Sequence, residues 1–257
     1  MTYLKDCNDQ NLIDLKNIHL HFKMPTNSVK TIKEMVASLT SKNINHLETP
    51  DFFTCLSGIT LQVKPGDRLA ILGRNGSGKT SLCYLMTKHL YPTHGEISIN
   101  AKIRAIYSNS TLPFPELSGL DNAKLFARLL YQNLRDNELE EIVIEAFNFS
   151  ELNQFKNVAI KNYSRGMTSR LILSLITARV AELMIIDEIF DGADQFFMEK
   201  FHHRLSSLLK NTNATIFISH DANILRKYCN RAIVIKDGKI AFEGPLEKAI
   251  FYYQNCH

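Results

Sequence analysis

The chain has 257 residues, of which 45% are hydrophobic and 22% charged, and its net charge is +4. These values are typical of an ordinary globular protein, with room for one large domain or for a domain with a sizeable insertion. The lysines and arginines are spread along the chain and form no blocks, which argues against a nucleic-acid-binding protein.

The cysteines and the apolar segments indicate a protein of the cytoplasm. The five cysteines have neither paired nor metal-like spacing, as expected of reduced thiols: Cys7, Cys55, Cys83, Cys229 and Cys256. The first segment, MTYLKDCNDQNLIDLK, has no apolar core of a secretory signal. The longest apolar run, LILSLITARVAELMIIDEIF, is interrupted by Arg179, Glu182, Asp187 and Glu188 and is too broken to cross a bilayer. Any membrane role is therefore expected to come through a partner.

Strands and helices alternate at both ends of the chain, and the middle is mostly helical. Residues 12–22 are expected as a strand, and residues 29–39 as a helix, because Val29, Ile32, Val36 and Leu39 have helical spacing. The later expected strands are 55–63, 67–73, 95–100, 103–107, 183–187, 214–219, 231–236 and 239–244. The later expected helices are 79 to about 90, 120–134, 137–147 and 164–180. This order predicts one α/β domain over 1–257, with a core of about 1–107 and 181–257 and an inserted helical subdomain of about 108–180.

A phosphate-binding loop follows the apolar strand RLAIL. The segment GRNGSGKT matches the pattern G-x-x-x-x-G-K-[ST] completely, and it opens the helix KTSLCYLMTKHL as the pattern requires. Its glycines would let the backbone curl so that successive N–H groups point at phosphate oxygens, and the helix N-terminus adds partial positive charge. Lys79 would contact the β- and γ-phosphates. The residues expected to bind the nucleotide here are Gly73, Arg74, Asn75, Gly76, Ser77, Gly78, Lys79, Thr80 and Ser81.

An acidic pair ends a later apolar strand, in the segment LMIIDE. A Mg²⁺ ion bound to a nucleotide needs a carboxylate at the end of a neighbouring strand, where ligands of parallel sheets bind. Asp187 would hold Mg²⁺, mainly through water, and Glu188 would polarise the attacking water. The Thr80 hydroxyl is the expected further Mg²⁺ ligand, with Ser81 as the alternative.

Another apolar strand ends in a histidine, in the segment TIFISHD. By topology His220 lies near the γ-phosphate, and we expect it to sense that group during catalysis. Each motif also has a structural interpretation: a glycine-rich turn, a solvated acidic pair and a strand-end histidine. Their occurrence together, each at the end of an apolar strand, favours a nucleotide site.

These motifs, in this order, resemble the ATPase subunit of ABC transporters over nearly the whole chain. In that superfamily a signature helix usually begins Leu-Ser-Gly-Gly-Gln, and by position YSRGM stands for it: Tyr163, Ser164, Arg165, Gly166 and Met167. The resemblance implies a P-loop nucleotide-binding domain with a mixed-sheet core, an antiparallel β subdomain and an inserted helical subdomain. It also implies that Ser164 and Gly166 contact ATP held by a second copy. Asp194 lies where the family's loop spans the interface and would link the two sites.

Several segments are similar to exporters of bacterial cell-surface polysaccharides in particular. Those exporters have a Tyr-Ser-x-Gly-Met version of the signature. DEIFDGADQFF resembles their Asp-Glu-Val-Leu-Ala-Val-Gly-Asp-x-x-Phe run, and PELSGLDNAKL resembles their Pro-Glu-Leu-Thr-Gly-x-Glu-Asn segment. The C-terminal segment and the helix expected at 29–39 are also similar. Arg165 occupies a position that varies among these exporters, so it either faces solvent or adds charge near the partner's ATP.

Two positions depart from the superfamily pattern. The Gln that usually follows the strand before the helical insertion is missing from RAIYSNSTLPFPEL, so Ser108 or Asn109 would stand near Mg²⁺. We expect this change to alter coupling or Mg²⁺ hydration. The aromatic residue that usually stacks on adenine is Phe22 by position, with Phe52 and Phe53 as the alternatives.

The resemblance implies a homodimer, because one chain has one phosphate loop and one signature. The two copies would pack head to tail around two ATP and two Mg²⁺. The helical insertion would dock integral-membrane permease subunits, which would place the chain at the cytoplasmic face of the inner (plasma) membrane. The implied function is ATP hydrolysis that drives export of a capsule, O-antigen or teichoic-acid-like polymer. The alternatives are the ATPase of another transporter and a soluble ABC protein acting on DNA or the ribosome.

Overall fold

The computed structural model describes residues 11–23, 52–107, 114–187 and 194–255. The helix expected at 29–39 lies outside the described residues, and so do Ser108, Asn109 and Glu188. None of the described helices is long and apolar enough to span a membrane.

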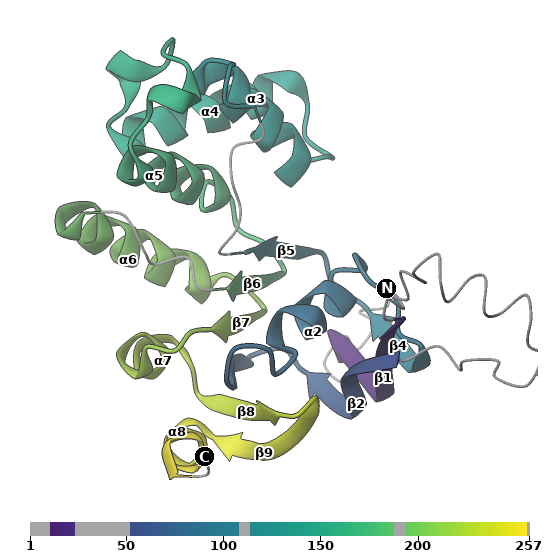
Figure 1. Cartoon of the computed structure of the whole chain (residues 1–257). Helices are drawn as coiled ribbons and strands as arrows, with labels where there is room; N and C mark the ends of the chain where they lie inside the picture. The colour runs from purple at the N-terminus through teal and green to yellow at the C-terminus, as the bar shows by residue number, and fades with distance from the viewer. Residues whose placement is uncertain (1–10, 24–51, 108–113, 188–193, 256–257) are drawn as a thin grey trace, which may run out of the picture.

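Two sheets form the β part of the molecule (Figure 1). The smaller sheet is antiparallel and has the order β2-β1-β4: β2 (Phe52–Val63), β1 (Ile13–Lys23) and β4 (His94–Ile99). The larger sheet has the order β5-β6-β7-β3-β8-β9: β5 (Ile103–Ile106), β6 (Leu183–Asp187), β7 (Ala214–Ile218), β3 (Arg68–Leu72), β8 (Arg231–Lys236) and β9 (Lys239–Pro245). All its pairings are parallel except that of β9, so the predicted mixed sheet and antiparallel β subdomain are confirmed.

The helices divide into those that follow core strands and those inserted between β5 and β6. The helices that follow core strands are α2 (Lys79–Met86), α6 (Gln195–Lys210), α7 (Ala222–Tyr228) and α8 (Leu246–Asn255). The inserted ones are α3 (Gly119–Leu130), α4 (Asp136–Ser150) and α5 (Arg165–Ile176). Figure 1 shows α3, α4 and α5 gathered beyond the edge strand β5, as the predicted helical insertion requires.

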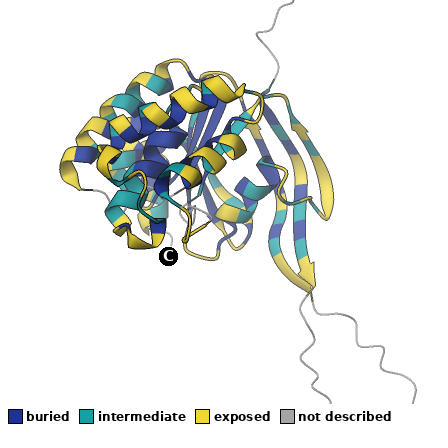
Figure 2. Cartoon of the chain, turned by 90° about the horizontal axis from the view of Figure 1, so that it is seen from above, coloured by how far each residue is buried: buried dark blue, intermediate teal, exposed yellow. Residues whose placement is uncertain are grey.

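The inner strands of the larger sheet, β6, β7, β3 and β8, are buried on both faces because their residues alternate between two apolar clusters. Leu69 and Ile71 of β3 pack with α2 and the smaller sheet. Ala70 and Leu72 point the other way, toward a cluster that includes α5, α6 and α8. In Figure 2 the interior strands are almost wholly buried, and exposed residues lie on the outer faces of the helices and along the strands of the smaller sheet. Burial on both faces explains why these strands are continuous apolar runs in the sequence.

Three helices end earlier than expected. The helix expected at 120–134 is α3, which ends at Leu130, whereas the helix expected at 137–147 is α4, which extends to Ser150. The helix that begins at Lys79 was expected to reach about residue 90, but α2 ends at Met86 because Lys88 adopts a left-handed conformation with φ of 60°. The helix expected to reach residue 180 ends at Ile176. In these last two cases a threonine follows the last helical residue, and its hydroxyl donates to the carbonyl four residues earlier. These local bonds compete with helix continuation.

A candidate nucleotide site

The loop between β3 and α2 is held tightly against strand β2. Gly78, the residue before α2, has φ of 104°, a conformation that favours glycine. A Cβ atom at this position would lie 2.6 Å from Leu56 Cδ2 and 3.0 Å from the carbonyl oxygen of Cys55. The close packing of β2 therefore fixes where the loop ends and where the N-terminus of α2 points.

Lys79 holds its own loop in shape. Its Nζ donates to the carbonyl oxygen of Gly73 at 2.7 Å and to that of Arg74 at 2.9 Å. The ammonium group therefore lies over the concave side of the loop, where the sequence predicts the β- and γ-phosphates. A phosphate there would interact with an ammonium group that is already held in position.

Thr80 and Asp187 meet between α2 and the end of β6. The Thr80 hydroxyl donates to Asp187 Oδ2 at 3.4 Å, and Asp187 is only 4% exposed. The Ser81 hydroxyl instead accepts the Cys55 thiol at 3.2 Å. A hydroxyl and a carboxylate are hard oxygen ligands of the kind that Mg²⁺ prefers, usually one or two from the protein with the rest from phosphate and water. The residues fit that ion, and Thr80 fits better than Ser81.

A cleft of about 520 Å³ runs from this pair toward the smaller sheet. It is lined by the following residues: Phe22, Phe53, Cys55, Asn75, Gly76, Gly78, Lys79, Thr80, Ser81 and Asp187. Phe22 and Phe53 face each other across β1 and β2. Phe52, the other alternative for stacking on adenine, does not line the cleft, and its ring is 60% exposed. The structure therefore brings two of the three candidate rings to the phosphate loop.

His220 lines an adjoining cleft of about 560 Å³ together with Gly73, Arg74 and Lys79. It directly follows Ser219, the buried residue at the end of β7, whose hydroxyl accepts the backbone N–H of Asp221 at 3.1 Å. This bond turns the chain sharply after the strand and leaves the imidazole exposed. His220 and Lys79 thus line the same cleft.

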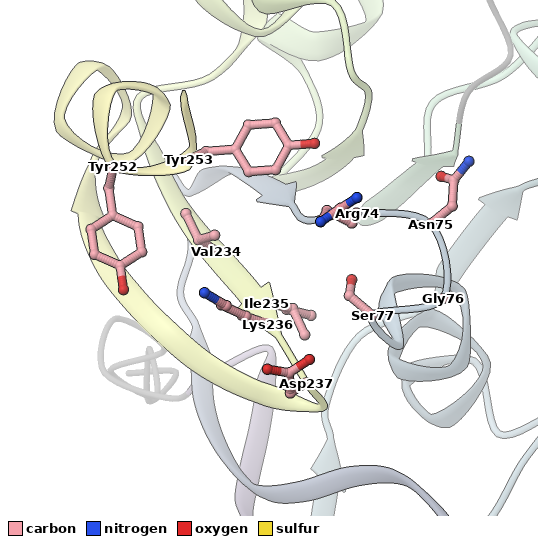
Figure 3. A pocket seen from close by; sticks show the side chains of 10 residues that line it. All are labelled: Arg74, Asn75, Gly76, Ser77, Val234, Ile235, Lys236, Asp237, Tyr252 and Tyr253. Atoms are coloured by element: carbon pink, nitrogen blue, oxygen red, sulfur yellow. The ribbon is translucent and has the colours of Figure 1, made fainter. Parts of the chain in front are cut away.

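The phosphate loop also borders a separate cavity of about 350 Å³ on the side of α8 (Figure 3). Arg74, Ser77 and Asp237 lie around it, with Tyr252 and Tyr253 from α8. Lys79, Thr80 and Asp187 do not line this cavity. It therefore lacks the lysine, threonine and aspartate that suit a nucleotide triphosphate with Mg²⁺, although it shares Asn75 and Gly76 with the first cleft.

The signature segment opens helix α5. Ser164 caps the helix, because its hydroxyl accepts the backbone N–H of Met167 at 3.2 Å. Tyr163 is buried, and its hydroxyl donates to the carbonyl oxygen of Phe155 at 2.8 Å. Its ring packs against Gly119 at the start of α3, where a Cβ atom would lie 2.8 Å from Cζ of Tyr163. Tyr163 therefore anchors the signature, while Ser164 and Arg165 stay exposed.

The signature and Asp194 are not part of either cleft that holds Lys79. No residue of α5 lines those clefts, and neither does Asp194. Asp194 instead caps α6, and its Oδ1 accepts the backbone N–H of Phe197 at 3.0 Å. One chain thus assembles Gly73–Ser81, Asp187, His220 and the two phenylalanines, but it leaves Ser164, Gly166 and Asp194 elsewhere.

Comparisons with known proteins agree with this geometry. A family model described as ABC transporter matches residues 56–191, from β2 to just past β6. The chain belongs to the ABC transporter family. It is thus an ATP-binding ATPase of that family.

Two relatives illustrate the match within the ABC transporter family. The O-antigen export system ATP-binding protein RfbE of Yersinia enterocolitica is 31% identical, over 74% of this chain and 79% of its own length. The teichoic acids export ATP-binding protein TagH of Staphylococcus haemolyticus is 26% identical, over 94% of this chain and 88% of its own length. Both are named as ATP-binding proteins, and ATP binding is what the sequence predicts for this chain.

Solved structures confirm the fold. The dimeric bacterial ABC transporter cassette MJ0796 superimposes with a TM-score of 0.70 at 22% identity, over 91% of this chain and 98% of that one. The same cassette in a post-hydrolysis state bound to ADP and Pi gives a TM-score of 0.69. At this identity the likeness concerns the ABC ATPase fold alone.

Cys55 and Tyr253 line the clefts although no motif pointed to them. Cys55 had a signal in the sequence, since it lies two residues after Phe53 and so on the same face of a strand. Tyr253 had none, because its position depends on how the C-terminal helix packs beside β8.

Proposed function

We propose that the chain is the ATP-hydrolysing subunit of an ABC transporter that exports a cell-surface polysaccharide across the cytoplasmic membrane. The polymer would be of the capsule, O-antigen or teichoic-acid type. The observation that carries this proposal is the match to export ATP-binding proteins over most of the chain, with the YSRGM signature at the start of α5.

Lys79 and the N-terminus of α2 would hold the triphosphate. The loop N–H groups and the ammonium neutralise charge that builds up on the phosphates as the bond to the γ-phosphate breaks. Thr80 and Asp187 would hold Mg²⁺, which supplies further charge neutralisation when bound. Phe22 and Phe53 lie where the base would emerge from the cleft, and their faces offer a stacking surface for adenine.

Glu188 and His220 would act on the γ-phosphate side. Glu188 directly follows Asp187 in the chain, and we assign it the role of polarising the attacking water. His220 faces the same space as Lys79, so it can donate a hydrogen bond to the γ-phosphate. Positioning and electrostatic stabilisation would supply most of the rate enhancement.

Ser164, Gly166 and Asp194 would complete the site of a second copy. They lie outside both clefts of their own chain, so a head-to-tail homodimer is the arrangement that lets them contact ATP. In that dimer the signature would close over ATP held by the partner's phosphate loop. ATP would stabilise the closed state because it contacts both copies, and hydrolysis would loosen it.

The helices α3–α5 would dock the permease subunits at the cytoplasmic face of the inner (plasma) membrane. This arrangement turns closure of the ATPase dimer into movement of the polymer. The runner-up function is the ATPase of a transporter for small molecules or lipids, which would use the same phosphate loop and Asp187 with a different permease.

The catalytic assignment is tested with Glu188→Gln. We expect turnover to fall about a hundredfold or more, because the water loses its polarising group. ATP-stabilised dimers should persist, as measured by light scattering after size exclusion with and without ATP. The matched control is Glu140→Gln on the exposed face of α4, which should turn over ATP normally. Normal hydrolysis by Glu188→Gln would show that the base assignment is wrong.

The transport assignment is tested in cells and membranes. The chain should co-purify from membranes with an integral-membrane permease, and cells that carry Lys79→Ala should lose a surface glycan while still making the protein. Analysis of surface polysaccharides from both strains checks this result. An unchanged surface glycan, with loss of a small molecule or lipid instead, would favour the runner-up function.

A further inference from the structure

Arg170 joins the signature helix to the start of α6. It lies in α5, four residues after Gly166, and one of its terminal nitrogens (Nη1) is 3.6 Å from Oδ2 of Asp194. The Arg170 side chain is largely buried, at 23% exposure, whereas the Asp194 side chain is 54% exposed. A partly buried cation on one element therefore faces an exposed carboxylate on another, with 23 residues of chain between them.

Asp194 uses its two oxygens for different purposes. Oδ1 accepts the backbone N–H of Phe197 and caps α6, while Oδ2 faces Arg170. The bond from Phe197 and, more weakly, the charge of Arg170 lower the pKa of the Asp194 carboxyl below its ordinary value. Both contacts favour the ionised form, so the carboxylate stays charged and oriented near neutral pH.

This pair is the end of a row of contacts between α6 and the helical insertion. Arg204 forms an ion pair with Glu145 of α4 at 2.8 Å, and Lys200 forms one with Glu151 at 2.9 Å. Phe197 lies between these contacts and the Asp194 cap, with its ring edge against Phe149. The part of α6 from its N-cap to Arg204 therefore contacts the helical insertion, and the Arg170 contact lies at the N-terminal end of that part.

We propose that Arg170 is a positioning residue that makes the signature helix and the start of α6 move as one unit. The proposal rests on the proposed function, in which Ser164 and Asp194 both meet the partner copy. If the two elements moved independently, each would lose conformational entropy separately when it bound the partner copy. A charged contact between them presents both in one fixed arrangement, so that closure over ATP brings Ser164 and Asp194 into place together.

The test is a double-mutant cycle on the full-length chain with Arg170→Gln and Asp194→Asn. Asparagine caps helices as well as aspartate does, so Asp194→Asn removes the charge and keeps the cap of α6. We expect each single variant to lower kcat about tenfold and to leave the affinity of the phosphate loop for ATP within twofold. The double variant should be no slower than either single variant, because both remove the same contact. Arg170→Lys should recover part of the rate.

Arg128→Gln is the matched control, because Arg128 pairs with Asp136 inside the helical insertion and touches neither α5 nor α6. It should turn over ATP at the wild-type rate. Losses that multiply to about a hundredfold in the double variant would overturn the proposal, and so would unchanged kcat in both single variants. Coupling seen in thermal unfolding but absent from kcat would also overturn it, since the contact would then be purely structural. If the wild-type chain did not turn over ATP, the proposed function would be wrong, and the role of Arg170, which depends on it, would fall as well.

Discussion

The phosphate loop and the signature segment are both helix starts, yet they are built in opposite ways. The loop is complete within one chain, because β2 packs under Gly78 and Lys79 bonds to the loop's own carbonyl oxygens. The signature exposes Ser164, lines neither cleft that holds Lys79, and has Tyr163 as its buried residue. The difference shows that the phosphate loop is preorganised by local contacts, whereas the signature is an exposed surface, which in the proposed homodimer would meet the second copy.

The largest effect is expected from removing the lysine of the phosphate loop. Lys79→Ala should lower ATP turnover about a hundredfold or more, because the triphosphate loses its positioned cation and the loop loses two hydrogen bonds. Steady-state phosphate release measures the effect. Lys124→Ala, on the exposed face of α3, is the matched control and should behave as wild type. Equal rates for the two variants would contradict the assignment of the loop.

A smaller effect is expected where the signature is anchored. Gly119→Ala would push a methyl group into the Tyr163 ring, so we expect it to cost about 1–3 kcal/mol of unfolding free energy. Denaturant unfolding of the full chain measures that loss. In a Tyr163→Phe background the same substitution should cost less, since part of the clash is with the hydroxyl. An equal cost in both backgrounds would mean that Tyr163 does not pack on Gly119 as described.

The smallest effect is expected at the exposed side of the signature. Arg165→Gly should leave the ATP affinity and kcat within about twofold, because Arg165 is exposed and glycine is tolerated near a helix start. Dimerisation and turnover at varied ATP concentration measure both quantities. A clear loss of affinity would show that Arg165 adds charge near the partner's ATP, and the signature would then be more than a cap and a backbone contact.

Much of the fold could be predicted because its signals are local. The strands 183–187 and 231–236 have the predicted bounds, since each is an apolar run of the length that a buried parallel strand needs. The loop Gly73–Thr80 lies where the sequence predicts it for the same reason, with a strand before it and a helix after it. The pattern of residues was sufficient wherever a segment's partners were its immediate neighbours in the chain.

The rest depends on contacts between segments far apart in the chain. The sequence pattern did not show that Phe22 and Phe53, rather than Phe52, line the cleft. That outcome depends on the register between β1 and β2, which pairs Phe22 with Phe53. The contact of Arg170 with Asp194 was equally invisible, since it needs the crossing of α5 and α6. The early end of α2 could not be predicted for a different reason. The bond from the Thr87 hydroxyl to the Cys83 carbonyl is local, but a threonine alone is too weak a signal to locate a helix end.

The backbone of β2 under the phosphate loop has a consequence for how this sequence can diverge. Gly78 approaches the Cys55 carbonyl from one side, and Gly238 in the turn between β8 and β9 approaches it from another, where a Cβ atom would lie 2.6 Å away. The two glycines are far apart in the chain, yet the same carbonyl oxygen excludes a side chain at both. A mutation at either site cannot be compensated by moving β2 without disturbing the other, so the two positions are expected to be lost or kept together as lineages separate.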